Sequence, residues 1–199
     1  SAATDSDGDV AENTGFLAQE IIATKVTVTP TPTPKPVSEN EESVSKSGDE
    51  GKPGKSRQIG EYTWTIDVPD DDRAGTAEEI LQALNAYRQK HGKGNLSWND
   101  KLASFARSRA DKFSGEAKTD GHAGFMDFLN NQDGFSKLGF MRLGENSSLG
   151  YKVSASHLIE WVYAGDSPHD TNQLSSEWTH VGIGVNGLAT DLIFAGNPF

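Results

Sequence analysis

The chain has 199 residues and no cysteine, which excludes disulfides, cysteine nucleophiles and thiolate metal sites. Its formal net charge of -11 argues against nucleic acid as a partner, because an acidic surface repels phosphate backbones. Hydrophobic residues make up only 34% and the mean hydropathy is -0.59, which indicates either an unusually polar domain or a part of the chain that does not fold.

Residues 1–58 are predicted to be a flexible N-terminal tail and Pro-rich linker. Residues 29–36 read TPTPTPKP, a pattern that favours extended polyproline II structure, and the following Ser, Glu, Lys and Gly have almost nothing to bury. Residues 16–28 are the one apolar stretch here and are compatible with a short helix, a docking strand or a weakly ordered tail. No stretch reaches the roughly 18 apolar residues of a transmembrane helix, and we expect any signal or anchor to lie upstream of Ser1.

Residues 59–199 are predicted to fold as one domain. Residues 62–68 alternate β-branched and aromatic residues with polar ones and predict a strand. Thr76 and Glu79 form a capping-box pattern at the start of a helix that ends at Gly92. A second helix begins at Asn99 or Asp100. Its apolar face contains a charge that must reach the surface or find a partner; the residues of this face are Leu102, Phe105, Ala106, Arg109 and Phe113.

The C-terminal part predicts a third helix over residues 154–163 and then a β-hairpin. Asn186-Gly187 indicates the turn, because both residue types tolerate positive φ. Gly182 and Gly184 share one face of the first hairpin strand and leave room for close packing against it. Helices between one early strand and a late hairpin indicate an α+β fold.

Two histidines are the main candidates for chemistry. His122 in DGHAGF and His169 in GDSPHD lie in loop-like sequence, as does Glu145 in LGENSSLGY, and loops often display functional side chains. These three side chains could converge in one cleft. The remaining histidines are expected to be structural or solvated, with the last of them a reserve candidate: His91, His157 and His180.

The succession LNAYRQKHG, LSWNDKLASFARSRA, GHAGF, GENSSLGY, EWVYAGDSPHDTNQL and WTHVGIGV resembles the CAP superfamily, the SCP-like proteins, and in particular its bacterial branch. The resemblance covers residues 75–199. It implies an α-β-α sandwich, in which helices cover both faces of a small antiparallel sheet, preceded here by the disordered linker. The absence of cysteine distinguishes the chain from the disulfide-rich eukaryotic members.

The resemblance also implies a central cleft with two histidines and two acids. His122 and His169 correspond to the histidines and Glu145 to the first acid. Where the eukaryotic pattern has the second acid this chain has Ala164, so Asp166 is the nearest candidate and Glu160 the alternative.

Two imidazoles and one or two carboxylates suit a divalent metal such as zinc, with His122 and His169 as its ligands. We therefore expect a secreted or cell-surface monomer, a binding protein rather than an enzyme, whose cleft binds a metal or a small ligand. One alternative is a metal-dependent hydrolase acting on peptides or envelope polymers with the same cleft. Another is a structural module with a relict cleft that binds a cell-envelope partner.

Overall fold

The computed structural model describes residues 16–22 and 53–199, and the prediction of a linker over most of residues 1–52 lies outside this part of the chain. Within it, residues 16–22 form a strand, one of the possibilities that the sequence left open. The division of the chain at residue 58 remains a prediction. The elements in chain order are β1 (Phe16–Ile22), β2 (Arg57–Gln58), β3 (Thr63–Thr65), α1 (Ala77–Lys90), β4 (Ser97–Trp98), α2 (Asp100–Glu116), α3 (Ala123–Asn131), α4 (Gly134–Leu138), β5 (Phe140–Leu149), α5 (Ala155–His157), the π-helical turn η1 (Leu158–Tyr163), α6 (Ser167–Gln173), β6 (His180–Asn186) and β7 (Ala189–Pro198).

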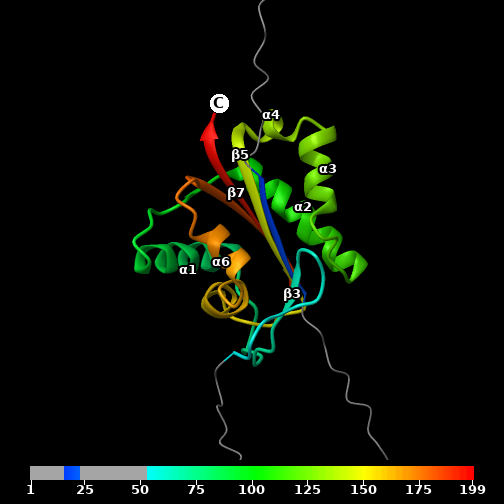
Figure 1. Ribbon diagram of the computed structural model, residues 1–199, viewed down its shortest axis with the longest axis vertical. Coiled ribbons are helices and arrows are strands. Elements are labelled where there is room, and N and C mark those ends of the chain that lie inside the picture. The colour runs from blue at the N-terminus through cyan, green and yellow to red at the C-terminus, as the bar shows by residue number, and fades with distance from the viewer. Residues whose placement is uncertain (1–15, 23–52) are drawn as a thin grey trace, which may run out of the picture.

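One mixed sheet forms the middle layer, with the strand order β2-β3-β1-β5-β7-β6-β4. Its centre is antiparallel: β5 pairs with β7, and β7 with β6. Parallel pairings are added on both sides, where β1 pairs with β5 and β3, and β4 pairs with β6. Figure 1 shows α1 and α6 on one side of this sheet and α2 and α3 on the other. The predicted α-β-α sandwich is confirmed.

The helix starts follow from local hydrogen bonds that the sequence predicts. The side chain of Thr76 accepts a hydrogen bond from the N–H of Glu79, and the Glu79 carboxylate accepts one from the N–H of Thr76, so the capping box opens α1 as expected. Asn99, rather than Asp100, caps α2, because its side chain accepts from the N–H groups of Lys101 and Leu102. Both caps satisfy N–H groups that lack a partner inside the helix.

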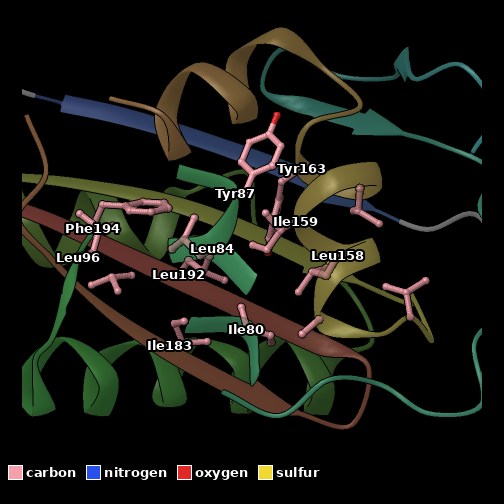
Figure 2. Packing of buried hydrophobic residues seen from close by; sticks show 14 of the residues in the cluster. Ile80, Leu84, Tyr87, Leu96, Leu158, Ile159, Tyr163, Ile183, Leu192 and Phe194 are labelled. Atoms are coloured by element: carbon pink, nitrogen blue, oxygen red, sulfur yellow. The ribbon is translucent and has the colours of Figure 1, made fainter. Parts of the chain in front are cut away.

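The larger hydrophobic cluster lies between α1, η1 and one face of the sheet. Ile80 and Leu84 of α1 and Ile159 of η1 meet Ile183 of β6 and Leu192 of β7, and all are buried. Figure 2 shows these side chains gathered between the helices and the strands. A second cluster, which includes Leu102, Phe125, Leu143 and Ile193, lies on the opposite face under α2 and α3.

Two glycines of β6 set the distance between the sheet and α2. A Cβ atom at Gly182 would lie 2.0 Å from the backbone nitrogen of Ala103, and one at Gly184 would lie 2.3 Å from the carbonyl carbon of Ala106. The close packing expected from the sequence is therefore made by the backbone of α2. The hairpin is also confirmed, but Asn186 pairs with Ala189, so Gly187 and Leu188 form the turn and Gly187 takes the positive φ of 60°.

Within the described residues, no helix is long and apolar enough to cross a lipid bilayer. This finding agrees with the expectation from the sequence for this part of the chain.

The glycine contact generates a stability prediction. Gly184→Ala places a methyl group too close to the backbone of α2. Overpacking typically costs about 1–3 kcal/mol, and a backbone neighbour cannot move aside as a side chain can. We therefore expect the free energy of unfolding to fall by about 3 kcal/mol or more. Chemical denaturation measures the change. Gly94→Ala is the matched control, because a Cβ there meets nothing within 4 Å. Equal stabilities of the two variants would show that α2 does not pack this closely on β6.

Candidate functional site

A buried arginine organises one half of the site. Arg109 of α2 is 4% exposed, and its Nε donates to Glu145 Oε1 at 2.8 Å. Its two terminal nitrogens donate to the two oxygens of Asp120 at 2.7 Å each. The sequence predicts that Arg109 reaches the surface or pairs, and the structure shows pairing. A bidentate guanidinium–carboxylate contact fixes both groups in direction as well as in position.

Glu145 joins this arginine to the first candidate histidine. Glu145 lies in the middle of β5, fully buried, and its Oε2 is 2.6 Å from His122 Nδ1. His122 is the N-cap residue of α3, is 2% exposed and has a φ of 66°. A non-glycine residue in the left-handed region costs about 1–2 kcal/mol, and such residues are concentrated at functional sites.

The other ring nitrogen of His122 faces the interior without a hydrogen bond. His122 Nε2 is buried and has no hydrogen-bond partner among the described residues. With Nδ1 donating to Glu145, the neutral ring carries its lone pair on Nε2. Burying such a group without a partner costs free energy, so this nitrogen is the atom of the site that is best placed to bind something else.

A third carboxylate, that of Asp191, lies close to this cluster and has a raised pKa. Asp191 of β7 is fully buried, and burial first, then the negative charge of Glu145, raises its pKa well above the usual range. Burial alone would also raise the pKa of Glu145, but the hydrogen bond from His122 and the charge of Arg109 outweigh it and hold that pKa low. Glu145 is thus ionised at neutral pH, and Asp191 keeps its proton to a higher pH than an ordinary aspartate does.

The second histidine forms a separate pair on a short helix. Asp166 is the N-cap of α6 and accepts from the backbone N–H of His169 at 3.1 Å. Its two carboxylate oxygens also lie 2.7 and 2.8 Å from His169 Nδ1. Both residues are buried, and the His169 ring stacks on Tyr163 with centroids 5.7 Å apart. A carboxylate that holds Nδ1 of a histidine fixes the tautomer and the orientation of the ring.

The two pairs approach β5 from opposite faces. Successive residues of a strand point to opposite sides, so Glu145 faces His122 while Asn146 faces the helix that carries His169. The Asn146 side chain donates to the carbonyl of His169 at 3.2 Å and accepts from Asn172 at 2.8 Å. Asn172 also donates to the carbonyl of Glu145 at 3.3 Å. This amide network ties α6 to β5 and fixes the position of His169 relative to Glu145.

Of the two candidate acids, Asp166 is the one that lies beside His169. Asp166 contacts it directly, whereas Glu160 is exposed and its carboxylate lies 3.9 Å from Lys90 Nζ. The other three histidines bind neighbours outside the site: the backbone carbonyl of Tyr87 for His91, Asp71 for His157 and Thr179 for His180.

The expectation that three loops carry the site is wrong. Glu145 lies within a ten-residue strand, His169 lies in α6, and only His122, at the N-cap of α3, lies at the end of a loop. The polar sequence around Glu145 lacks the alternation of a surface strand, because neighbouring elements cover both faces of β5.

The side chains do not by themselves form a metal site. Within the described residues, no group of three or more His, Asp or Glu side chains is placed to hold an ion. His122 and His169 each direct Nδ1 to a carboxylate and approach β5 from different faces, so the expected pairing of the two as zinc ligands is not seen in this arrangement.

Sequence reasoning missed Asp120, Asp191, Asn146 and Asn172. One of them left a signal: Asp191 is the single charge in ATDLIFAG, and an acid inside an otherwise apolar strand predicts a buried partner. The other three lie in polar stretches whose burial depends on contacts between distant elements.

The raised pKa of Asp191 predicts how the stability of the protein depends on pH. An unfolded aspartate loses its proton near pH 3.9, whereas the folded Asp191 retains it to higher pH, so the folded state binds more protons and its stability falls as pH rises through this interval. Asp191→Asn removes this loss. We expect the variant to become more stable relative to the wild type between pH 4 and pH 8, by about 1.4 kcal/mol for each unit of the pKa shift.

Urea unfolding at pH 4, 6 and 8 measures this difference. Asp72→Asn is the control, because it makes the same substitution at an exposed position. A difference between Asp191→Asn and the wild type that stays constant from pH 4 to pH 8 would show that Asp191 is ionised in the folded protein.

Comparisons with known proteins agree on one family. A model of the cysteine-rich secretory protein family, CAP, matches residues 81–193. Secreted protein PRY1 of Candida albicans is 29% identical over 123 residues, which are 61% of this chain and 26% of that protein. The chain therefore spans about a quarter of the length of this relative.

A solved structure shares the fold. An extracellular protein containing an SCP domain from Bacillus anthracis has a TM-score of 0.51 and 19% identity, over 68% of this chain and 47% of that chain. A cysteine-rich secretory protein from Staphylococcus aureus has a TM-score of 0.49 and 18% identity, over 60% of this chain and 37% of that one. The family model covers more than half of the sequence, and the chain belongs to the CAP family, the cysteine-rich secretory proteins.

Proposed function

We propose that this protein is an extracellular CAP domain whose two histidine–carboxylate pairs border a binding site for a small ligand. The buried Nε2 of His122, which has no hydrogen-bond partner among the described residues, is the observation that carries the proposal. A ligand that gives this nitrogen a hydrogen-bond donor or a coordination bond would satisfy it. The extracellular location is supported by the relative from Candida albicans, which is a secreted protein.

The electrostatics of the site favour a ligand that is cationic or donates hydrogen bonds. Glu145 is ionised and its charge is shared with Arg109 and His122. A second carboxylate, Asp166, orients His169 in the same way. Two carboxylates that each polarise an imidazole increase the ability of the outer ring nitrogens to accept a proton or bind a positive group.

In the metal form of this proposal, the ligand is a divalent ion such as zinc, and His122 and His169 are its protein ligands. Since the described side chains do not form a three-ligand set, such an ion would have to bring the two histidines closer together or take further donors from elsewhere. The assignments to the bacterial branch and to a monomer remain predictions. The hydrolase and the structural module with a cell-envelope partner also remain sequence-based alternatives, and no observation favours either.

Thermal unfolding in stepped Zn²⁺ tests the metal form. A ligand present at a hundred times its Kd adds about 2.7 kcal/mol to the free energy of unfolding, which raises the Tm by several degrees. We expect that rise in the wild type and its loss in His122→Ala and His169→Ala. His157→Ala is the matched control and should keep the rise, because His157 binds Asp71 outside the site.

The outcomes separate the forms of the proposal. A rise that survives in His122→Ala would contradict binding at this site. If zinc has no effect on any of these proteins, the metal form is wrong, and the same variants then serve to screen small cationic and amide ligands by the same shift.

A further inference from the structure

Strand β1 comes from the far N-terminal part of the chain and lies inside the sheet. Its backbone pairs in parallel with β5 along its whole length, from Phe16 opposite Leu143 to Ile22 opposite Leu149. Its other edge pairs in parallel with β3, with Glu20 opposite Thr63 and Ile21 opposite Trp64. Figure 1 shows β1 running alongside β5. The segment thus fills a slot whose two walls are β5 and β3.

The walls of this slot carry the candidate site. Ala18 pairs with Glu145 and Gln19 with Asn146, the two residues that face the His122 and His169 sides of the sheet. The β3 region also reaches both histidines, since the ring of Tyr62 is 6.5 Å from that of His122 and the ring of Trp64 is 5.7 Å from that of His169. Helix α6, which carries His169, packs against β1. The slot therefore passes between the two histidine–carboxylate pairs.

The wall formed by β5 has an unusual composition for a strand buried on all sides. Glu145, Asn146, Ser147 and Ser148 are each at most 1% exposed, yet strands covered on both faces are ordinarily near-continuous apolar runs. Polar side chains suit a strand that forms the wall of a groove, because water contacts this wall when β1 leaves. Main-chain hydrogen bonds between strands are also made by any extended peptide, because they do not depend on side-chain identity.

We propose that the slot between β5 and β3 is a binding site for an extended peptide strand, and that residues 16–22 of the same chain fill it and close access to His122 and His169. The occupant is the chain's own segment rather than that of a second copy. Residues 23–52 can reach about 3.3 Å per residue when extended, which is ample for a connection within one molecule, and such a connection gives an effective concentration that can be on the order of millimolar. The slot does not depend on the ligand proposed above, but a ligand would enter when β1 leaves.

A disulfide trap tests the occupancy in the full chain, which has no cysteine of its own. Ile22 and Leu149 are Cα partners, so the double variant Ile22→Cys, Leu149→Cys brings two thiols within bridging range. We expect an intramolecular disulfide after mild oxidation. The control pair Ile22→Cys, Phe199→Cys should not close, because Phe199 follows the far end of β7. A pair that fails to close, or that closes only between two molecules, would overturn the occupancy within one chain.

Backbone substitutions test whether the slot accepts a peptide. Successive residues of a parallel strand direct their N–H groups to opposite sides, so Ala18→Pro with Gln19→Pro removes the one N–H of the two that faces β5. We expect the amides of residues 144–148 that face β1, which alternate along β5 with those that face β7, to exchange with solvent at least about tenfold faster, while those of β7 opposite β6 remain protected and report an intact fold. Val44→Pro with Ser45→Pro is the matched control outside β1 and should exchange as the wild type does.

Adding a synthetic peptide with the sequence of residues 16–22 completes the test. The peptide should restore protection of residues 144–148 in the Ala18→Pro, Gln19→Pro variant in a saturable manner, and should leave the wild type unchanged because its slot is full. If residues 144–148 exchange equally fast in the wild type and the variant, β1 does not fill the slot. If the peptide gives no protection to the variant, the slot is not a peptide-binding site.

Discussion

The ion pair between Arg109 and Glu145 is the contact on which the candidate site depends. A buried guanidinium and a buried carboxylate are each costly to remove from water, and each is held in place by the charge of the other. Asp120 accepts from both terminal nitrogens of Arg109 in a bidentate contact, so the arginine is shared between two carboxylates. Burial and the charge of Glu145 raise the pKa of Asp191 even though the charge of Arg109 acts to lower it, and His122 is oriented by Glu145 Oε2.

The position of α2 makes this ion pair possible. Gly182 and Gly184 allow the backbone of α2 to approach β6, and this approach brings Arg109 to the level of Glu145 in β5. On the opposite face, the amides of Asn146 and Asn172 connect β5 to α6 and so to His169. One strand therefore determines the positions of both histidine–carboxylate pairs, and β1 pairs along one edge of that strand.

Much of this arrangement could be predicted from local sequence, because the determinants are close along the chain. Thr76 and Glu79 predict the start of α1, the glycines of β6 predict close packing, and an arginine on an apolar helix face predicts a buried partner. Loop-like sequence singled out His122, Glu145 and His169, and the resemblance to the CAP family joined them in one cleft. Asp166 was the nearest acid to the position where this chain departs from the family pattern. The strand around Glu145 could not be recognised, since its polar residues are buried by elements far away in the sequence. The pairing of β1 was likewise beyond prediction, because a seven-residue apolar segment carries no information about which edge it will join.

A double-mutant cycle on the central ion pair tests this account most directly. Arg109→Met and Glu145→Gln should each lower the free energy of unfolding by about 3–5 kcal/mol, because each leaves a buried charge without its partner. The double variant leaves neither of these two charges buried without its partner. Its loss of stability should therefore be about 2 kcal/mol smaller than the sum of the losses in the two single variants. If the two effects add to within about 0.5 kcal/mol, Arg109 and Glu145 are not coupled, and the site is not organised by this pair.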